Sequence, residues 1–275
     1  MTMNKGPKFY QSDLLVSSSA EHGFFTRLGG VSSGIFESLN IGGRQGDEPS
    51  NTVQNKTIIA GSFGLPLSAL KLASQVHGNG VAIIDETNSD VDFSAIEADG
   101  LVTKLPHIIL GINTADCCPL LFLDDRNHII GIAHAGWRGA FSGIIPATLA
   151  AMVKIGADDI TAIKVALGPA ISQSSYEVDE VFRDRFISQR ESNLQFFSSS
   201  ARHAHHYLFD LKAYVKATVV DLGIREFHDV GLDTYAMENE FFSCRRAYHA
   251  SPNLRKFGVQ FSGIVLKDYD RSKKS

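Results

Sequence analysis

The chain has 275 residues, of which 44% are hydrophobic and 20% are charged, and its formal net charge is −4. A chain of this length can bury a substantial core, and its slightly acidic balance gives no basic footprint for nucleic acid. No apolar run approaches the roughly 20 residues that cross a bilayer, and the N-terminal segment lacks the apolar core of a signal peptide. We therefore expect neither nucleic acid nor a membrane as a partner.

Cysteine usage indicates the compartment. The three cysteines are an odd number, and two of them, Cys117 and Cys118, are adjacent in sequence. This pattern argues against a disulfide framework and favours a reducing, cytoplasmic location. No linker, low-complexity tract or repeat divides the chain, so residues 1–275 are expected to form a single domain.

Short apolar runs rich in Val and Ile dominate the middle of the chain, and helical spacing appears on either side of them. In chain order, the patterns predict a helix over 51–63, strands that start at Gly80, Gly100, Ile108, Leu120 and Ile129, a helix over 140–155, a strand that starts at Ala162, and helices over 179–189 and 210–222. The polar interval 188–206 is interpreted as a surface loop. Strands outnumber helices without regular alternation, which predicts an α+β fold with mixed or antiparallel sheets flanked by helices.

Two neighbouring runs suggest where a site lies. LLFLD from Leu120 and IIGIAHA from Ile129 are joined by the short segment DDRNH, so they are expected to pair as an antiparallel hairpin. Cys117 precedes the first strand and His134 ends the second. Because those two ends meet at the rim opposite the loop, Cys117 and His134 are predicted to be neighbours.

A third residue, His77 in QVHG, has a similar setting, because glycines follow or flank both histidines. Imidazole nitrogen and thiolate sulfur are ligands that Zn²⁺ prefers, and three protein ligands with an open position are typical of a catalytic site. The same atoms also suit a cysteine nucleophile with a histidine base. None of the standard zinc spacings occurs. The residues alone leave both alternatives open.

Other segments offer possible anion contacts. The glycine-rich stretch from His22 to Asp47 contains Arg27 and Asn40 and could cradle an anion, although such stretches are usually turns. In FFSCRR, Arg245 and Arg246 are either a solvated basic face or an anion contact. A further cluster, of His203, His205 and His206, is interpreted as a solvent-exposed run.

The order of the motifs FTRLGGVSSGIFESLN, QVHG, ADGLVT, TADCCP, AHAGWRG, LGPAIS, FDL and FFSCRR resembles the bacterial YfiH-type proteins, also called the polyphenol oxidase or laccase-domain family. The resemblance runs from about His22 to Leu266, and TADCCP with AHAGWRG is its most specific part. The chain has Asp233 and Thr234 where many members of the family have Cys-Thr.

The resemblance implies a zinc-dependent purine nucleoside phosphorylase that converts adenosine, inosine or guanosine and phosphate to base and ribose 1-phosphate. It also implies adenosine deaminase and S-methyl-5′-thioadenosine phosphorylase activities. By the same resemblance His77, Cys117 and His134 are the metal ligands and catalytic residues. The resemblance also places Arg27, Asn40 and Arg138 at the substrate or phosphate.

Two other activities remain alternatives. One is a cysteine-nucleophile hydrolase or amidase acting on a cell-wall precursor, with Cys117 as the nucleophile. The other is copper-dependent oxidation of phenols, which needs additional copper sites that the ten scattered histidines do not visibly supply. Zinc is therefore favoured over copper, and the sequence does not predict an oligomeric state.

Overall fold

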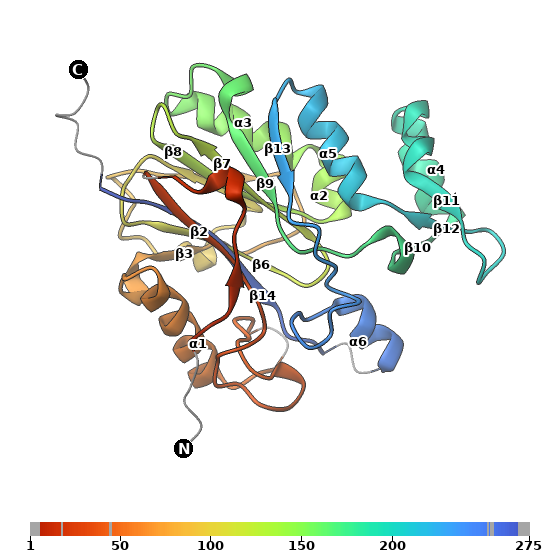
Figure 1. The fold of residues 1–275 in the computed structure, drawn as a ribbon, viewed down its shortest axis with the longest axis horizontal. Helices are drawn as coiled ribbons and strands as arrows, with labels where there is room; N and C mark the ends of the chain where they lie inside the picture. The colour runs from red at the N-terminus through yellow and green to blue at the C-terminus, as the bar shows by residue number, and fades with distance from the viewer. Residues whose placement is uncertain (1–5, 18, 44–45, 252, 254–255, 269–275) are drawn as a thin grey trace.

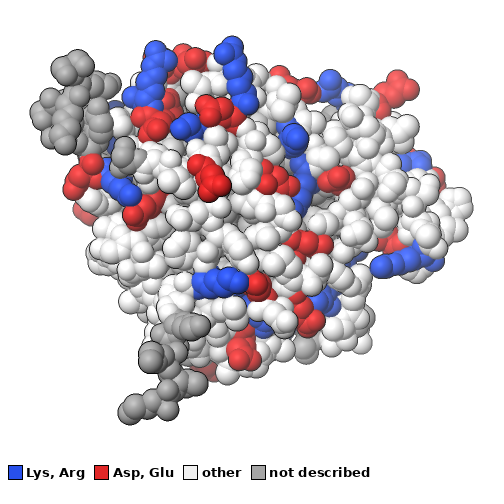
Figure 2. Space-filling view, in the orientation of Figure 1, with Lys and Arg blue, Asp and Glu red and all other residues white. Residues whose placement is uncertain are grey.

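Two β-sheets stacked face to face lie at the centre of the fold, and helices cover their outer surfaces (Figure 1). The structure is a computed structural model that describes residues 6–17, 19–43, 46–251, 253 and 256–268. On the face shown in Figure 2, basic and acidic side chains are interspersed.

The larger sheet has six strands in the order β13-β9-β7-β8-β5-β4. The outer pairs, β13 with β9 and β5 with β4, are parallel, and the inner pairs are antiparallel. The bounds of its strands, in chain order, are β4 Val81–Ile84, β5 Gly100–Thr103, β7 Cys118–Asp124, β8 Ile129–Ala135, β9 Lys164–Leu167 and β13 Glu226–Asp229.

The second sheet has five strands in the order β1-β2-β14-β6-β3, of which only β6 and β3 pair in parallel. Its strands are β1 Phe9–Tyr10, β2 Ala20–Phe25, β3 Leu70–Leu72, β6 Ile109–Thr114 and β14 Gln260–Leu266. A small antiparallel sheet lies beside these two and contains β10 Glu177–Asp179, β11 Phe197–Ser199 and β12 His206–Phe209.

The helices are α1 Pro49–Ser62, α2 Trp137–Ser142, α3 Ile144–Lys154, α4 Glu180–Gln189, α5 Leu211–Asp221 and α6 Cys244–Ala250. Side chains of Asp179, Asp210 and Ser243 cap α4, α5 and α6 by accepting hydrogen bonds from backbone N–H groups of the first turn. None of the described helices combines the length and apolar character that crossing a bilayer requires.

The alternation of side chains along β7 explains the layered core. Leu120 and Phe122 pack toward α3 and α5, whereas Leu121 and Leu123 pack between the two large sheets. All four are fully buried. Because successive side chains of a strand point to opposite faces, a continuous apolar run is what a strand needs when both of its faces are covered. A third apolar cluster joins α1 to the outer face of the five-stranded sheet.

The α+β class with mixed sheets is confirmed, as are all six predicted strands and the β7–β8 hairpin. Two predictions were wrong in detail. The helix over 140–155 is divided into α2 and α3 at Gly143, whose φ of +91° lies in the left-handed region. The interval 188–206 is not only a loop, because it forms a 3₁₀ helix over Glu191–Phe196 and the strand β11.

The layered core predicts that apolar side chains between the sheets carry much of the stability. Replacing Leu121 by alanine is expected to lower the free energy of unfolding by about 2–5 kcal/mol, because it leaves a cavity where both faces are packed. Leu194, which is 53% exposed, is the matched control, and L194A should change stability by less than about 1 kcal/mol. Denaturant titration measures both, and equal losses in the two variants would contradict this description of the core.

Candidate functional site

The hairpin brings Cys117 and His134 together as the sequence predicts. Cys118 is paired with Ala135 and Pro119 with His134, so Cys117 lies at the open end of the hairpin. His77 reaches the same point from the turn between β3 and β4. The ligand atoms of Cys117, His77 and His134 all lie within 4.8 Å of one another. The two imidazole rings are 4.7 Å apart, nearly perpendicular at 76°.

A buried carboxylate, Asp99, joins two of these residues. Its Oδ1 accepts hydrogen bonds from His134 Nδ1 at 2.8 Å and from the backbone N–H of His77 at 3.0 Å. Its Oδ2 accepts from the backbone N–H groups of Val76 and Gly78 at 3.1 and 2.7 Å. Successive N–H groups around one carboxylate fix the QVHG turn, in which His77 has a φ of +61°. The bond to Nδ1 leaves Nε2 of His134 for the site.

The electrostatics of Cys117 and His134 are coupled. Burial opposes ionisation of the Cys117 thiol, but the charge of His134 and the hydrogen bonds from His134 and His77 outweigh it and lower the pKa of Cys117. Burial likewise disfavours a charged His134, but the Cys117 thiolate and the Asp99 hydrogen bond outweigh it and raise the pKa of His134. The site therefore stabilises the thiolate form of Cys117, which is the form that binds a metal or acts as a nucleophile.

Two glycines of the AHAGWRG motif allow this packing. A Cβ at Gly136 would lie 2.9 Å from Cys117 Sγ, 3.1 Å from the His77 ring and 3.7 Å from His134 Nε2. A Cβ at Gly139 would lie 2.8 Å from the backbone oxygen of Gly78. The motif therefore contains glycine where α2 meets the three side chains and the QVHG turn.

The residue before Cys117 anchors its loop. Asp116 has a φ of +86°, and its carboxylate accepts hydrogen bonds from Thr234 Oγ1 at 2.7 Å, Ser243 Oγ at 3.0 Å and the backbone N–H of Arg245 at 2.7 Å. Burial raises the pKa of Asp116 despite these bonds. The C-terminal segment that carries α6 is thus attached directly to the loop of Cys117.

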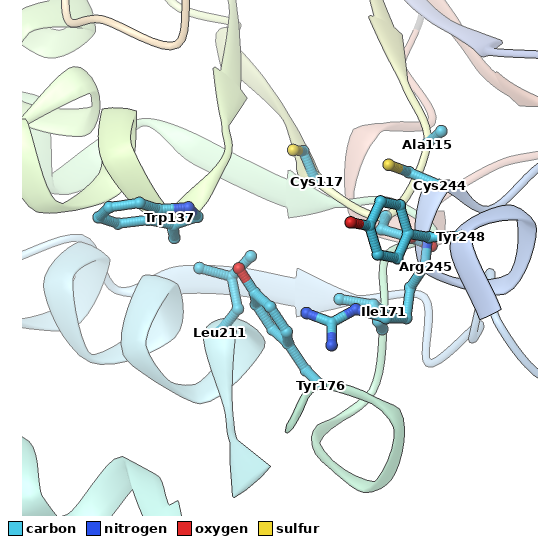
Figure 3. Close-up of a pocket in the computed structure, with 10 residues that line it drawn as sticks. Ala115, Cys117, Trp137, Ile171, Tyr176, Leu211, Cys244, Arg245 and Tyr248 are labelled. Carbon is cyan, nitrogen blue, oxygen red and sulfur yellow. The ribbon is translucent and has the colours of Figure 1, made fainter. Parts of the chain in front are cut away.

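A cavity of about 400 Å³ opens beside Cys117 (Figure 3). Aromatic and apolar side chains form much of its wall, and Arg245 supplies a positive charge. In Figure 3 the hydroxyl of Tyr248 faces the middle of this space, below the sulfur of Cys117. The lining residues are Ala115, Asp116, Cys117, Trp137, Ile171, Tyr176, Leu211, Cys244, Arg245 and Tyr248. A largely apolar cavity with a few polar groups beside reactive side chains is typical of a small-molecule site.

The donor set fits a single metal ion. Zinc binds imidazole nitrogen at about 2.0–2.1 Å and thiolate sulfur at about 2.3 Å, and ligand atoms within 4.8 Å of one another can reach one such ion. Three protein ligands would leave one position of a four-coordinate ion for water or substrate. The same geometry also contains an Asp99–His134–Cys117 series in hydrogen-bond order, which is the arrangement of a cysteine nucleophile, its base and an orienting acid.

The structure places Arg27 outside this cavity. Its Nε donates to the backbone oxygen of Glu37 at 2.6 Å and its Nη1 to that of Glu238 at 3.3 Å, and its guanidinium lies 4.4 Å from the centroid of the Phe242 ring. It is not among the residues that line the cavity. Its role at the substrate stays a prediction.

Asn40 is fully buried and its amide is engaged within the glycine-rich segment. Its Nδ2 donates to Gly42 O and Asp47 Oδ2, and its Oδ1 accepts from the N–H groups of Gly42 and Val259. Arg138 is exposed on α2, with its guanidinium 4.9 Å from the Trp137 ring centroid. Neither residue lines the cavity, and their predicted roles remain untested.

Sequence reasoning missed Asp99 and most of the cavity wall. Asp99 belongs to ADGLVT, whose position before a strand gives no signal for a contact with QVHG. Trp137 belongs to AHAGWRG and Arg245 to FFSCRR, but only the fold shows that α2 and α6 meet at Cys117. The two glycines and the tryptophan of AHAGWRG were the sequence signal that this segment packs closely against the site.

Comparisons with known proteins show which family and which structures the chain is similar to. Residues 21–267 match the family model described as multi-copper polyphenol oxidoreductase laccase. Purine nucleoside phosphorylase RP494 of Rickettsia prowazekii is 37% identical over 197 residues, which cover 71% of this chain and 78% of that protein. Purine nucleoside phosphorylase YfiH of Escherichia coli is 29% identical, covering 80% and 86%. The crystal structure of Neisseria meningitidis protein NMB0706 has a TM-score of 0.82 and 28% identity, covering 96% and 100%.

The close approach at Gly136 predicts that a single methyl group disrupts the site. In G136A the new Cβ displaces Cys117 Sγ and the His77 ring, so the variant is expected to lose most of its metal. G61A is the matched control, because nothing lies within 4 Å of its Cβ on α1. Elemental analysis of both purified variants checks this, and a full metal complement in G136A would contradict it.

The role of Asp99 predicts an effect on affinity. D99N removes the charge that orients His134 and gathers the QVHG turn, and is expected to weaken metal binding roughly 10- to 100-fold. D85N is the matched control, because Asp85 makes only local hydrogen bonds in an exposed turn. Competition with a chelator measures both affinities, and an unchanged affinity in D99N would refute the assignment.

Proposed function

The chain belongs to the multi-copper polyphenol oxidoreductase laccase family, and from this premise we propose that it is a zinc-dependent purine nucleoside phosphorylase. The observation that carries the proposal is the group of His77, Cys117 and His134, of which Cys117 lines an aromatic cavity large enough for a nucleoside. In the reaction a phosphate oxygen forms a bond to C1′ of the ribose while the glycosidic bond breaks. The electron pair of that bond leaves with the purine, which takes up a proton.

Zinc is proposed on the chemistry of the donors. Two imidazoles and one thiolate are zinc ligands, and a bound ion would itself favour the thiolate of Cys117 and the neutral form of His134. A bound zinc ion would supply Lewis acidity at its open position.

The side chains of the cavity have complementary tasks. The rings of Trp137, Tyr176 and Tyr248 offer flat apolar surface for a purine base and exclude water from it. Asp99 keeps His134 in one orientation and holds the turn of His77. The purine and the two histidines are thereby held in one relative orientation. Holding reacting groups in place in this way lowers the entropic part of the activation barrier.

We propose two further activities for the same site. Deamination of adenosine would use the same open position on the metal. Phosphorolysis of S-methyl-5′-thioadenosine suits the apolar side chains of Ile171 and Leu211, which can accept a methylthio group. Arg138, exposed next to Trp137, is proposed to contact substrate at the rim.

A cysteine hydrolase is the second candidate, because the Asp99–His134–Cys117 series and the lowered pKa of Cys117 suit a nucleophile equally well. Oxidation of phenols by several coppers has less support. Among the described residues, His77, Cys117 and His134 form the one group of three His, Cys or carboxylate side chains close enough to hold a metal.

The proposal predicts that metal and activity depend on one of two adjacent cysteines. C117A is expected to lose both bound zinc and phosphate-dependent release of base from adenosine. C118A is the matched control and should keep both, because the Cys118 side chain lies in the apolar core. Phosphorolysis that survives in metal-free C117A would sink the proposal. A covalent substrate adduct at Cys117 of the metal-free protein would favour the hydrolase instead.

A further inference from the structure

Arg245 is the one arginine on the wall of the cavity beside Cys117 among the residues that the structure describes. Its backbone N–H is bound to Asp116, which precedes Cys117. Its guanidinium donates one hydrogen bond, from Nη1 to the backbone oxygen of Glu177 at 2.9 Å, and lies 5.2 Å from the centroid of the Tyr176 ring. Figure 3 shows this guanidinium within the cavity, alongside Tyr176.

The neighbouring Arg246 shows what a structural arginine looks like here. It donates to the backbone oxygens of Thr234 at 2.7 Å, Tyr235 at 2.8 Å and Phe241 at 2.5 Å. Among the described residues, by contrast, the Arg245 side chain has a single hydrogen-bond partner, and no carboxylate lies within 4.0 Å of it. A half-buried guanidinium with most of its donors unused and no ion pair favours an anion in the adjoining space.

The surroundings indicate on which side of Arg245 the anion lies. Trp137, Tyr176 and Arg245 line both the cavity at Cys117 and a second cavity of about 370 Å³. The second cavity is also lined by His206 and by two carboxylates, those of Glu177 and Asp179, whereas the first cavity has one carboxylate, that of Asp116. The Asp116 carboxylate beside Cys117 already accepts hydrogen bonds from three donors. The first cavity is therefore the more favourable one.

We propose that Arg245 binds the inorganic phosphate co-substrate in the cavity beside Cys117, an inference that deepens the proposed phosphorylase function. A planar guanidinium can bind two phosphate oxygens at once and lower the repulsion between phosphate and the thiolate of Cys117. Asp116 precedes Cys117 and accepts a hydrogen bond from the backbone N–H of Arg245. It therefore holds the phosphate-binding arginine at a fixed distance from the proposed metal ligand Cys117.

The kinetic test separates the two substrates. R245Q is expected to raise the KM for phosphate roughly 10- to 100-fold, the loss expected for a charge-assisted hydrogen bond, while the KM for adenosine changes less than about twofold. R245K retains the charge without the planar fork and should give an intermediate KM for phosphate. The charge-matched control is R225Q, because Arg225 is exposed, lies directly before β13 and lines neither cavity. An unchanged KM for phosphate in R245Q, or an equal rise for both substrates, overturns the proposal.

A binding measurement keeps this proposal distinct from the phosphorylase function. Calorimetric titration of inorganic phosphate into the metal-loaded wild type, R245Q, R245K and R225Q needs no turnover. Binding to wild type and R225Q that is lost in R245Q supports the role of Arg245 even where adenosine is not phosphorolysed, a result that would refute only the proposed function. Equal phosphate affinity in wild type and R245Q, or no phosphate binding by wild type at millimolar concentration, refutes the role of Arg245.

Discussion

The hydrogen bonds to the Asp99 carboxylate are the interaction on which the candidate site depends. One buried side chain orients His134 and gathers three consecutive N–H groups of the turn that presents His77. Hydrogen bonds from His134 and Gly78 outweigh the effect of burial and lower the pKa of Asp99, so the carboxylate is charged. A charged acceptor at this point ties a strand end and a distant turn into one unit, which a neutral side chain could not do as strongly.

The layered fold supplies the rigid frame around that unit. The β7–β8 hairpin is buried on both faces, so the positions of Cys117 and His134 at its open end are set by packing on two sides. Asp116 then links the same end to Thr234, Ser243 and Arg245 from the C-terminal segment. The candidate metal site and the cavity wall are therefore built from segments far apart in sequence that a few hydrogen bonds join. This explains how a cavity with chemically diverse walls keeps one geometry.

The sequence predicts those parts of the fold and the candidate site that depend on interactions between neighbouring segments. The hairpin follows from two apolar runs and a short polar connection, and it brings Cys117 to His134. The tertiary contacts do not follow, because nothing in ADGLVT indicates that Asp99 reaches QVHG, or in FFSCRR that α6 reaches Cys117. The strand β14 shows a different limit. Its Ser and Gly residues interrupt the apolar pattern, yet a Cβ at Gly263 would lie 2.4 Å from the ring of Phe261, so the buried sheet requires glycine there.

The central claim is that one metal ion at His77, Cys117 and His134 is needed for phosphorolysis. The most direct measurement removes the metal from the purified protein with a chelator, then follows ribose 1-phosphate formation from adenosine and phosphate as zinc is restored. The account predicts no product in the metal-free protein and a return of activity that saturates near a single equivalent of zinc. Full activity in the metal-free protein, or a return of activity without dependence on phosphate, would contradict it.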